Sequence, residues 1–389
     1  MKRMKKILAV TLSLAMVLAF TACGGGNSGE TIKIGFFAPV TAAAAAADGQ
    51  SAKQSAELAV QLINEAGGIN GQDVELVYYD DQLDTSQATS IAEKLTTSDE
   101  VVAVVSGSYS GPTRVAAPII QAAGIPLVSA YAVHPEVVNA GDFVFSQSFP
   151  GQVQGTAGGE YATKELGAKR IAIVAVDLDF GTELAGAFKA RAEANGAEIV
   201  SEDYIAITDS DMSAVVTKIK KENVDVIYMA NYYAQAAEVA KQCAVQGVEA
   251  KLIGTEGADS WQFIETAGEY ANGVILTTNM DRDAENEGTQ KYITKYKETY
   301  DMDSDMVGAS TYDAFQVLFA ALKEVGTDPA ALRDYIKGLT DFETVTGNLI
   351  KYTDNGEAVK AVQIQQVQDG AFHYLGVVDD LDIITPTKK

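Results

Sequence analysis

Hydroxyl-bearing residues and glycines follow an apolar stretch in the first third of the chain. The β-branched residues at 101–105 predict a buried strand, and the sequence GSYSGPT follows at 107–113. Ser110 precedes Gly111 and Pro112, so we expect it to cap a helix that starts there, because proline is tolerated in a first turn. The free backbone N–H groups of such a helix attract a carboxylate. The segment is therefore either a carboxylate-binding site or an ordinary capped helix.

Two segments in the second half of the chain suit a positive charge instead. VDVIYMANYY at 224–233 predicts a strand that ends in Tyr232 and Tyr233, and KLIGTEG at 251–257 predicts one that ends in Glu256. A carboxylate in a cleft is costly unless it meets a cation, and a tyrosine face adds cation–π attraction. Unless Glu256 is a solvated loop acid, these residues would hold an ammonium group. Together with the first segment they indicate a site for a zwitterionic α-amino acid.

The sequence lacks the residue combinations that catalysis and metal binding usually require. GSYSG at 107–111 resembles a nucleophile elbow, but its central residue is Tyr109 rather than serine or cysteine. His134 and His373 are the only histidines and lie far apart in the sequence. Of the two cysteines, Cys243 stands alone in an expected helix. We therefore expect no enzymatic activity, no cofactor, no metal site and no disulfide.

The length, the composition and the net charge indicate a two-lobed globular protein and argue against some classes of binding partner. The chain has 389 residues, which is more than one hydrophobic core usually serves, so two lobes are expected. Hydrophobic residues make up 47% and charged residues 21%, which is a normal globular balance. The 29 basic and 53 acidic residues give a net charge of −24, which argues against nucleic acid or an anionic membrane surface as a partner.

The amino terminus has the pattern of a secretion signal. A basic segment is followed by an apolar stretch at 7–20 that is too short to span a bilayer comfortably. FTAC at 20–23 is similar to the lipobox of bacterial lipoproteins, in which the cysteine is lipidated, and residues 23–30 then form a flexible tether. We expect residues 1–22, the signal peptide, to be removed and Cys23 to anchor the chain at the extracytoplasmic face of the cell membrane. A plain signal peptide with an incidental cysteine is the alternative.

Short apolar strands alternate with helices twice along the chain. The pattern predicts strands at 32–37, 74–79, 101–105, 126–129, 171–176, 224–229, 252–254 and 273–278, and helices at 50–66, 85–97, 182–194 and 234–246. Such alternation indicates an α/β protein with two Rossmann-like, three-layer lobes, each with a parallel sheet. Ligands of these sheets bind beyond the carboxyl ends of the strands. The alanine run at 42–47 falls in the first strand-to-helix loop, and no chemistry is assigned to it.

Several segments match one known family in the same order along the chain. LAVQLINEAGGING at 58–71 is the most recognisable, and IKIGFFAPVT at 32–41 matches the opening strand; further matches are at 80–81, 145–150, 171–177, 312–314 and 345–347. The chain resembles the substrate-binding lipoproteins of branched-chain amino acid ABC transporters, the leucine/isoleucine/valine-binding type of type I periplasmic binding proteins. The resemblance covers nearly all of the chain after the signal peptide.

The resemblance implies roles for individual residues. It assigns the ligand carboxylate to Ser110, Ser129, Ala132 and Val133, the ligand ammonium to Glu256 with Tyr232 or Tyr233, and the side-chain pocket to Tyr109, Tyr131 and Phe180. Val133 stands where the family often has threonine, which removes one hydroxyl contact. The loop at 42–48 lacks the tyrosine that often packs on the ligand side chain, so a larger or differently shaped side chain would fit.

The resemblance also implies the topology and the function. Three crossovers at a hinge would place residues 31–150 with 280–347 in lobe 1 and residues 151–279 with 348–389 in lobe 2. Hinge closure would bury an aliphatic, branched-chain amino acid, which this monomeric binding protein would deliver to an ABC transporter permease. Two alternatives stay open. The same scaffold could bind another small solute, such as an amide, an aromatic acid or another amino acid, or it could serve a sensory receptor.

Overall fold

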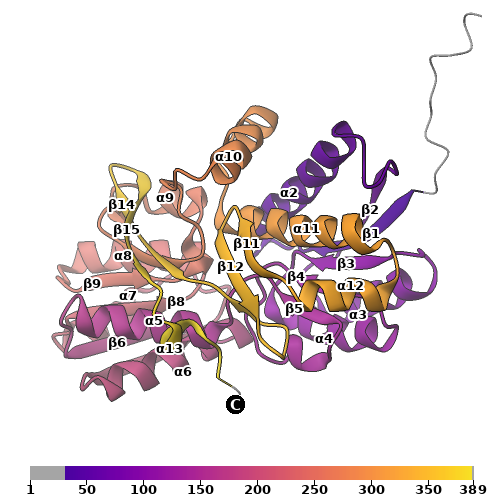
Figure 1. Ribbon diagram of the computed structural model, residues 1–389. Coiled ribbons are helices and arrows are strands. Elements are labelled where there is room, and N and C mark those ends of the chain that lie inside the picture. The colour runs from indigo at the N-terminus through magenta and orange to yellow at the C-terminus, as the bar shows by residue number, and fades with distance from the viewer. Residues whose placement is uncertain (1–30, 388–389) are drawn as a thin grey trace, which may run out of the picture.

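The computed structural model describes residues 31–387, which form two α/β lobes side by side (Figure 1). Each lobe has its own sheet, and helices cover the sheet faces, so the predicted fold class is confirmed. The expected signal peptide, the tether and the lipidation site at Cys23 lie outside the described residues. Between residues 31 and 387, no helix combines the length and the apolar character that crossing a membrane requires.

The first lobe contains a five-stranded, fully parallel sheet with the strand order β2-β1-β3-β4-β5. The strands β3, β4 and β5 are buried throughout, which explains their apolar sequences. Because all five strands are parallel, their carboxyl ends share one edge of the sheet. The strands are β1 (Ile32–Ala38), β2 (Val74–Asp80), β3 (Ala103–Ser106), β4 (Leu127–Ser129) and β5 (Val144–Ser146).

The second lobe contains a seven-stranded sheet with the order β15-β14-β10-β9-β8-β6-β7. The strands from β10 to β7 are parallel, whereas β14 and β15 are antiparallel additions at one edge. The sequence pattern predicted parallel strands only, because it did not extend to the part of the chain that supplies this pair. The strands are β6 (Arg170–Val176), β7 (Glu198–Ile205), β8 (Val226–Ala230), β9 (Lys251–Gly254), β10 (Ile275–Thr278), β14 (Val362–Gln368) and β15 (Ala371–Val378).

Helices connect most of these strands. The helix expected at 85–97 has the observed bounds, whereas the one expected at 50–66 begins earlier, at Ala46, so the end of the alanine run is helical. The first lobe has α2 (Ala46–Glu65), α3 (Thr85–Thr97), α4 (Ser110–Ala122) and the 3-10 turn η1 (Val138–Ala140). The second has α5 (Gly151–Lys164), α6 (Asp179–Ala194), α7 (Ser213–Lys220), α8 (Tyr233–Gln246), η2 (Glu256–Ala258), α9 (Trp261–Ala267) and η3 (Gly268–Ala271). The remaining helices are α10 (Glu287–Tyr300), α11 (Met306–Val325), α12 (Pro329–Lys337) and α13 (Leu381–Ile384).

The chain passes between the lobes three times. The first passage lies between β5 and α5, and the second follows β10. The third follows a small sheet of β11 (Thr340–Thr344), β12 (Gly347–Tyr352) and β13 (Ala358–Val359), and leads into β14. Helix α11 packs on α2, and α12 packs on α11, so the segment after the second passage completes the first lobe (Figure 1). The lobe boundaries at individual residues stay a prediction.

A cluster of buried polar side chains lies where the second and third passages between the lobes meet. Asp313 of α11 accepts hydrogen bonds from the backbone N–H of Val345 (2.8 Å) and of Thr346 (3.0 Å), and from the Thr346 hydroxyl (2.5 Å). The Nζ of Lys360 is 3.9 Å from Asp313 Oδ2, and it donates to the Thr344 hydroxyl at 3.1 Å. Both charged side chains are almost fully buried. We call Asp313, Thr344, Thr346 and Lys360 the hinge cluster.

Candidate functional site

A small cavity lies between the lobes. Its volume is about 20 Å³, which is room for about one water molecule. It adjoins a groove of about 420 Å³ that shares several of its lining residues. An amino acid needs more room than the cavity offers, so the lobes or the aromatic rings have to move apart to admit one. The cavity is lined by Asp48, Tyr109, Ser110, Tyr131, Phe180, Tyr232, Glu256, Gly257, Met306 and Val307.

Most of the lining residues follow the carboxyl ends of parallel strands. On the first lobe, Tyr109 and Ser110 follow β3, and Tyr131 follows β4. On the second lobe, residues that follow β6, β8 and β9 supply Phe180, Tyr232 and Glu256. Parallel sheets place these loops at one edge, so residues far apart in the sequence meet at one cavity. The structure therefore brings together the six residues Tyr109, Ser110, Tyr131, Phe180, Tyr232 and Glu256 of the sequence-based hypothesis.

Three aromatic rings form a stack across the cavity. The Tyr232 ring lies between Tyr109 at 4.5 Å and Phe180 at 4.9 Å, measured between ring centroids, with interplanar angles of 8° and 17°. Gly257 makes room for this stack, because a Cβ there would lie 3.1 Å from both Phe180 Cζ and Tyr232 Cδ1 and 2.8 Å from the Asn231 carbonyl oxygen. Since Tyr109 belongs to the first lobe and the other two rings to the second, the stack joins the lobes.

Glu256 is a buried carboxyl that lacks a cation. Its side chain is 3% exposed, the Ser148 hydroxyl donates to Oε2 at 3.3 Å, and Oε1 has no hydrogen-bond partner. Burial raises the pKa of Glu256 to about 8; hydrogen bonds with Ser148 and Gln154 lower it, and the charge of Asp259 raises it further. No lysine or arginine of the described part of the chain is among the groups that shift this pKa. An ammonium at Oε1 would supply the missing partner.

Ser110 lies at the N-terminal end of α4, but it does not cap the helix as predicted. It is the first helical residue, Tyr109 occupies the cap position with extended backbone, and no side chain makes a cap hydrogen bond. The Ser110 hydroxyl instead accepts from the backbone N–H of Val133 at 3.3 Å. The N-terminal end of α4 still faces the cavity through Ser110, where unpaired helix N–H groups favour an anion.

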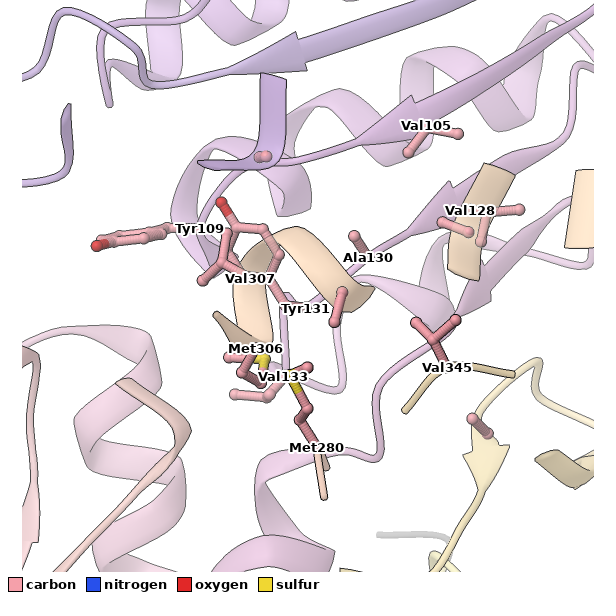
Figure 2. Packing of buried hydrophobic residues seen from close by; sticks show 14 of the residues in the cluster. Val105, Tyr109, Val128, Ala130, Tyr131, Val133, Met280, Met306, Val307 and Val345 are labelled. Carbon is pink, nitrogen blue, oxygen red and sulfur yellow. The ribbon is translucent and has the colours of Figure 1, made fainter. Parts of the chain in front are cut away.

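The other residues expected around the ligand carboxylate lie behind the cavity wall. The Ser129 hydroxyl accepts from the backbone N–H of Ala132 at 3.3 Å, so both are paired within the loop after β4. Val133 is packed in the apolar cluster near Met306 (Figure 2). Tyr233 does not line the cavity; it lines a separate groove with Ala43 and Ala44. Of the two tyrosines offered for the ammonium, Tyr232 is therefore the one at the cavity.

Asp48 lines the cavity and was missed by the sequence analysis. It is 3% exposed, lies in the first turn of α2, and accepts a hydrogen bond from the Tyr109 hydroxyl at 2.6 Å. Burial raises the pKa of Asp48 to about 7, the Tyr109 hydrogen bond lowers it, and the charge of Asp305 raises it. The alanine run before Asp48 gave no sequence signal for it. In the structure, the next residue, Gly49, packs closely on the strand-to-helix loop, because a Cβ there would lie 2.5 Å from the Pro39 backbone.

Met306 and Val307 supply an apolar wall that the sequence analysis also missed. They begin α11, whose cap residue Asp305 accepts a hydrogen bond from the backbone N–H of Gly308 at 2.8 Å. Figure 2 shows both side chains beside Tyr131, in the same buried cluster. The sequence offered no signal for this segment, because α11 follows a helix rather than a strand of the alternating pattern.

Neither cysteine nor histidine lines the cavity. Cys243 lies in the core of the second lobe, and burial raises the pKa of its thiol to about 12. Neither His134 nor His373 lines the cavity. Residues 31–387 contain no group of three or more histidine, cysteine, aspartate or glutamate side chains arranged to hold a metal ion.

Comparisons with known proteins identify the family. The family described as periplasmic binding protein matches residues 31–371. The leucine-, isoleucine-, valine-, threonine- and alanine-binding protein of Pseudomonas aeruginosa is 28% identical over 347 residues, which are 87% of this chain and 91% of that protein.

Solved structures agree with the sequence match. A leucine-binding protein of Thermotoga maritima superposes with a TM-score of 0.84 at 26% identity, covering 90% of this chain and 100% of the other. A branched-chain amino acid transporter substrate-binding protein of Streptococcus pneumoniae, in complex with isoleucine, gives 0.83 at 27% identity, covering 90% and 99%. With a two-lobe fold, an interlobe cavity and a family match over most of its length, the chain belongs to the periplasmic binding protein family.

Proposed function

We propose that this protein captures a small aliphatic amino acid as a zwitterion between its lobes and delivers it to an ABC transporter permease. The observation that carries the proposal is Glu256, whose buried Oε1 has no hydrogen-bond partner and which lines a cavity that has no lysine, arginine or histidine in its wall. A buried carboxyl of this kind is costly to ionise unless a positive group joins it. The α-ammonium of an amino acid provides that group.

The opposite wall suits the other end of the same ligand. Ser110 and the first turn of α4 offer a hydroxyl and helix N–H groups to a carboxylate, and the N–H of Val133 holds the Ser110 hydroxyl in place. Phe180, Met306 and Val307 offer apolar contacts to a short side chain. Because both charged ends must be paired when the lobes close, analogues that lack either end should bind far more weakly.

Relatives and the amino-terminal sequence support the remaining parts of the proposal. The Pseudomonas aeruginosa relative binds leucine, isoleucine, valine, threonine and alanine, and the Streptococcus pneumoniae protein binds isoleucine as part of a transporter. The FTAC sequence at 20–23 supports a lipid anchor on Cys23 at the extracytoplasmic face of the membrane. We propose that the protein performs no catalysis, which is supported by the buried, high-pKa thiol of Cys243 and by the position of both histidines outside the cavity wall. We also propose that it acts as a monomer.

The test is calorimetric titration of the chain that lacks residues 1–22 and carries Cys23→Ser, after any bound ligand has been removed by unfolding and refolding. The ligand panel contains leucine, isoleucine, valine and alanine, together with 4-methylpentanoate, which is leucine without its ammonium. We expect micromolar binding of amino acids and binding of the deaminated acid that is at least about 100-fold weaker.

The Glu256→Gln variant separates the role of the carboxylate from that of residue size. It should weaken amino acid binding by about 30-fold or more, since an ammonium then meets a neutral amide. The exposed Glu249→Gln variant is the matched control and should bind as the parent does. Equal binding of leucine and 4-methylpentanoate, or unchanged binding by Glu256→Gln, would overturn the zwitterion assignment.

A further inference from the structure

The cavity contains a second buried carboxyl that the zwitterion does not require. Asp48 reaches the cavity from the first turn of α2, beside the apolar wall of Met306 and Val307. An aliphatic side chain cannot donate a hydrogen bond to a carboxyl, and burying a carboxyl against hydrocarbon is unfavourable. An exclusively aliphatic ligand would therefore be served better by an apolar residue at position 48.

The neighbours of Asp48 leave it without a positive partner. Its carboxyl accepts a side-chain hydrogen bond from the Tyr109 hydroxyl, and a carboxylate with two oxygens can accept several such bonds. The nearby Asp305 adds a second negative group, which is itself occupied by the Ser51 hydroxyl at 2.5 Å and the Gly308 N–H at 2.8 Å. Among residues 31–387, no lysine or arginine belongs to the groups that shift the pKa of Asp48.

Asp48 and Glu256 occupy separate positions in the cavity. Glu256 is held from the second lobe and the first passage, where Ser148 donates to it and Asp259 is its acidic neighbour. Asp48 is held from the first lobe, where Tyr109 donates to it and Asp305 is its acidic neighbour. Because they share neither hydrogen-bond partner nor acidic neighbour, we assign them to different parts of the ligand.

We propose that Asp48 determines specificity by accepting a hydrogen bond from a hydroxyl or ammonium group on the side chain of the bound amino acid. This inference rests on the proposed function, because Glu256 and Ser110 must hold the α-ammonium and the α-carboxylate. The short aliphatic part of the ligand then contacts Met306, Val307 and Phe180, and its donor group reaches Asp48. A site that contains a buried acceptor discriminates strongly against a ligand that leaves this acceptor unpaired.

The test compares amino acids of equal size that differ in one donor group. Threonine and valine differ by a hydroxyl in place of a methyl, and ornithine and norleucine differ by an ammonium in place of a methyl. Calorimetry on the chain without residues 1–22 and with Cys23→Ser should give tighter binding of the donor-bearing member of each pair, by roughly 10-fold to 100-fold. The preference should be larger for the ornithine pair, because its donor is charged.

Two substitutions of Asp48 test whether this carboxyl causes the preference. Asp48→Leu keeps the number and branching of the side-chain heavy atoms and removes the acceptor, so both preferences should disappear or reverse. Asp48→Asn keeps an acceptor without the charge, so the threonine preference should survive in part and the ornithine preference should be lost. The exposed Asp73→Leu variant is the control and should behave as the parent does. Thermal unfolding of each variant establishes that it is folded.

The outcomes distinguish this inference from the proposed function. If no amino acid binds to the parent chain, the proposed function fails and the inference fails with it. If amino acids bind but the members of each pair bind equally, only the inference is wrong. If Asp48→Leu weakens all four ligands by the same factor, Asp48 serves the α-ammonium together with Glu256, and the inference is again wrong.

Discussion

The hinge cluster and the cavity both bury carboxyl groups, but they treat them differently. In the hinge cluster, Asp313 receives two backbone N–H groups, a hydroxyl and the ammonium of Lys360. In the cavity, Asp48 receives the Tyr109 hydroxyl, and Glu256 receives the Ser148 hydroxyl with a further side-chain hydrogen bond from Gln154. Asp313 therefore has more donors than either cavity carboxyl, and it alone of the three has a lysine beside it.

The two environments also place different demands on stability. Burial raises the pKa of Asp313, but Lys360, Thr346 and backbone N–H groups counter that effect, so its charge is compensated inside the protein. For Glu256, burial raises the pKa to about 8, and only the hydrogen bonds with Ser148 and Gln154 counter it, with no contribution from a lysine or arginine. The protein therefore keeps the cavity carboxyl at a cost to its ligand-free stability, and ligand binding offsets this cost. The carboxyl that we propose for ligand binding is thus the one whose charge the protein itself compensates less.

The largest expected effect comes from breaking the compensated pair. Asp313→Ala leaves the Lys360 ammonium buried beside hydroxyls alone, and it frees the N–H groups of Val345 and Thr346, so the free energy of unfolding should fall by about 3–5 kcal/mol. Lys360→Met should cost less, because Asp313 keeps its other donors. Urea denaturation measures both variants, and a smaller loss for Asp313→Ala than for Lys360→Met would contradict the comparison.

The cavity carboxyls should give the ligand-free protein an unusual pH dependence. The folded-state pKa of Glu256 is about 8, above its ordinary value of 4.5, and that of Asp48 is about 7, above 3.8. The folded state thus binds more protons than the unfolded state, so stability is greatest at low pH and is lost as pH rises through these values. Between pH 5 and pH 8, each group should contribute a loss of up to about 1.4 kcal/mol per pH unit.

Glu256→Gln sharpens this second prediction. Because the amide does not titrate, the variant should lose less stability than the parent between pH 5 and pH 8, and it should be at least as stable as the parent at pH 8. Denaturant unfolding at several pH values without ligand measures the slopes. The exposed Glu249→Gln variant should keep the slope of the parent chain. Parallel slopes for Glu256→Gln and the parent would show that this carboxyl is already ionised in the ligand-free protein.

The smallest expected effect comes from a partly exposed arginine–carboxylate ion pair between the lobes. Arg114 Nε of α4 lies 3.0 Å from Asp179 Oδ2 of α6, with side chains 37% and 35% exposed. Solvent screens such a pair, so Arg114→Ala should weaken ligand binding by less than about 1 kcal/mol, and the difference should shrink as salt is added. Calorimetry at low and high salt measures it. A loss of ligand affinity as large as that for Glu256→Gln would contradict the comparison, because an exposed ion pair would then matter as much as a buried carboxyl.

Much of the site could be predicted from the sequence because parallel sheets gather their loops at one edge. Tyr232 and Glu256 each follow a short apolar strand, and this position alone was enough to place them near a ligand. The apolar, β-branched character of β3, β6 and β8 made those strands easy to recognise. The family resemblance then predicted that residues of both lobes meet, and six of the predicted site residues do line one cavity.

Other parts depend on tertiary contacts that leave little trace in local sequence. Ser110 has the residue type of a helix cap, yet the chain enters the helix one residue earlier, so the hydroxyl is free to meet Val133. Asp48 directly follows a run of alanines, and this run has no hydrophobic periodicity from which the orientation of Asp48 could be predicted. Met306 and Val307 reach the cavity only because the chain returns to the first lobe at the second passage. The antiparallel strands β14 and β15 join the second sheet only because the chain crosses again at the third.

The three passages have a consequence for how the chain is made. The five strands of the first lobe are complete by Ser146, but α11, which packs on α2, begins only at Met306. During synthesis the first lobe must therefore wait for a helix encoded far downstream, with the apolar face of α2 uncovered in the meantime. Contacts of such long sequence separation slow folding and leave partly folded intermediates that are prone to aggregate. A product truncated before α11 should accumulate as an aggregate rather than as a free lobe.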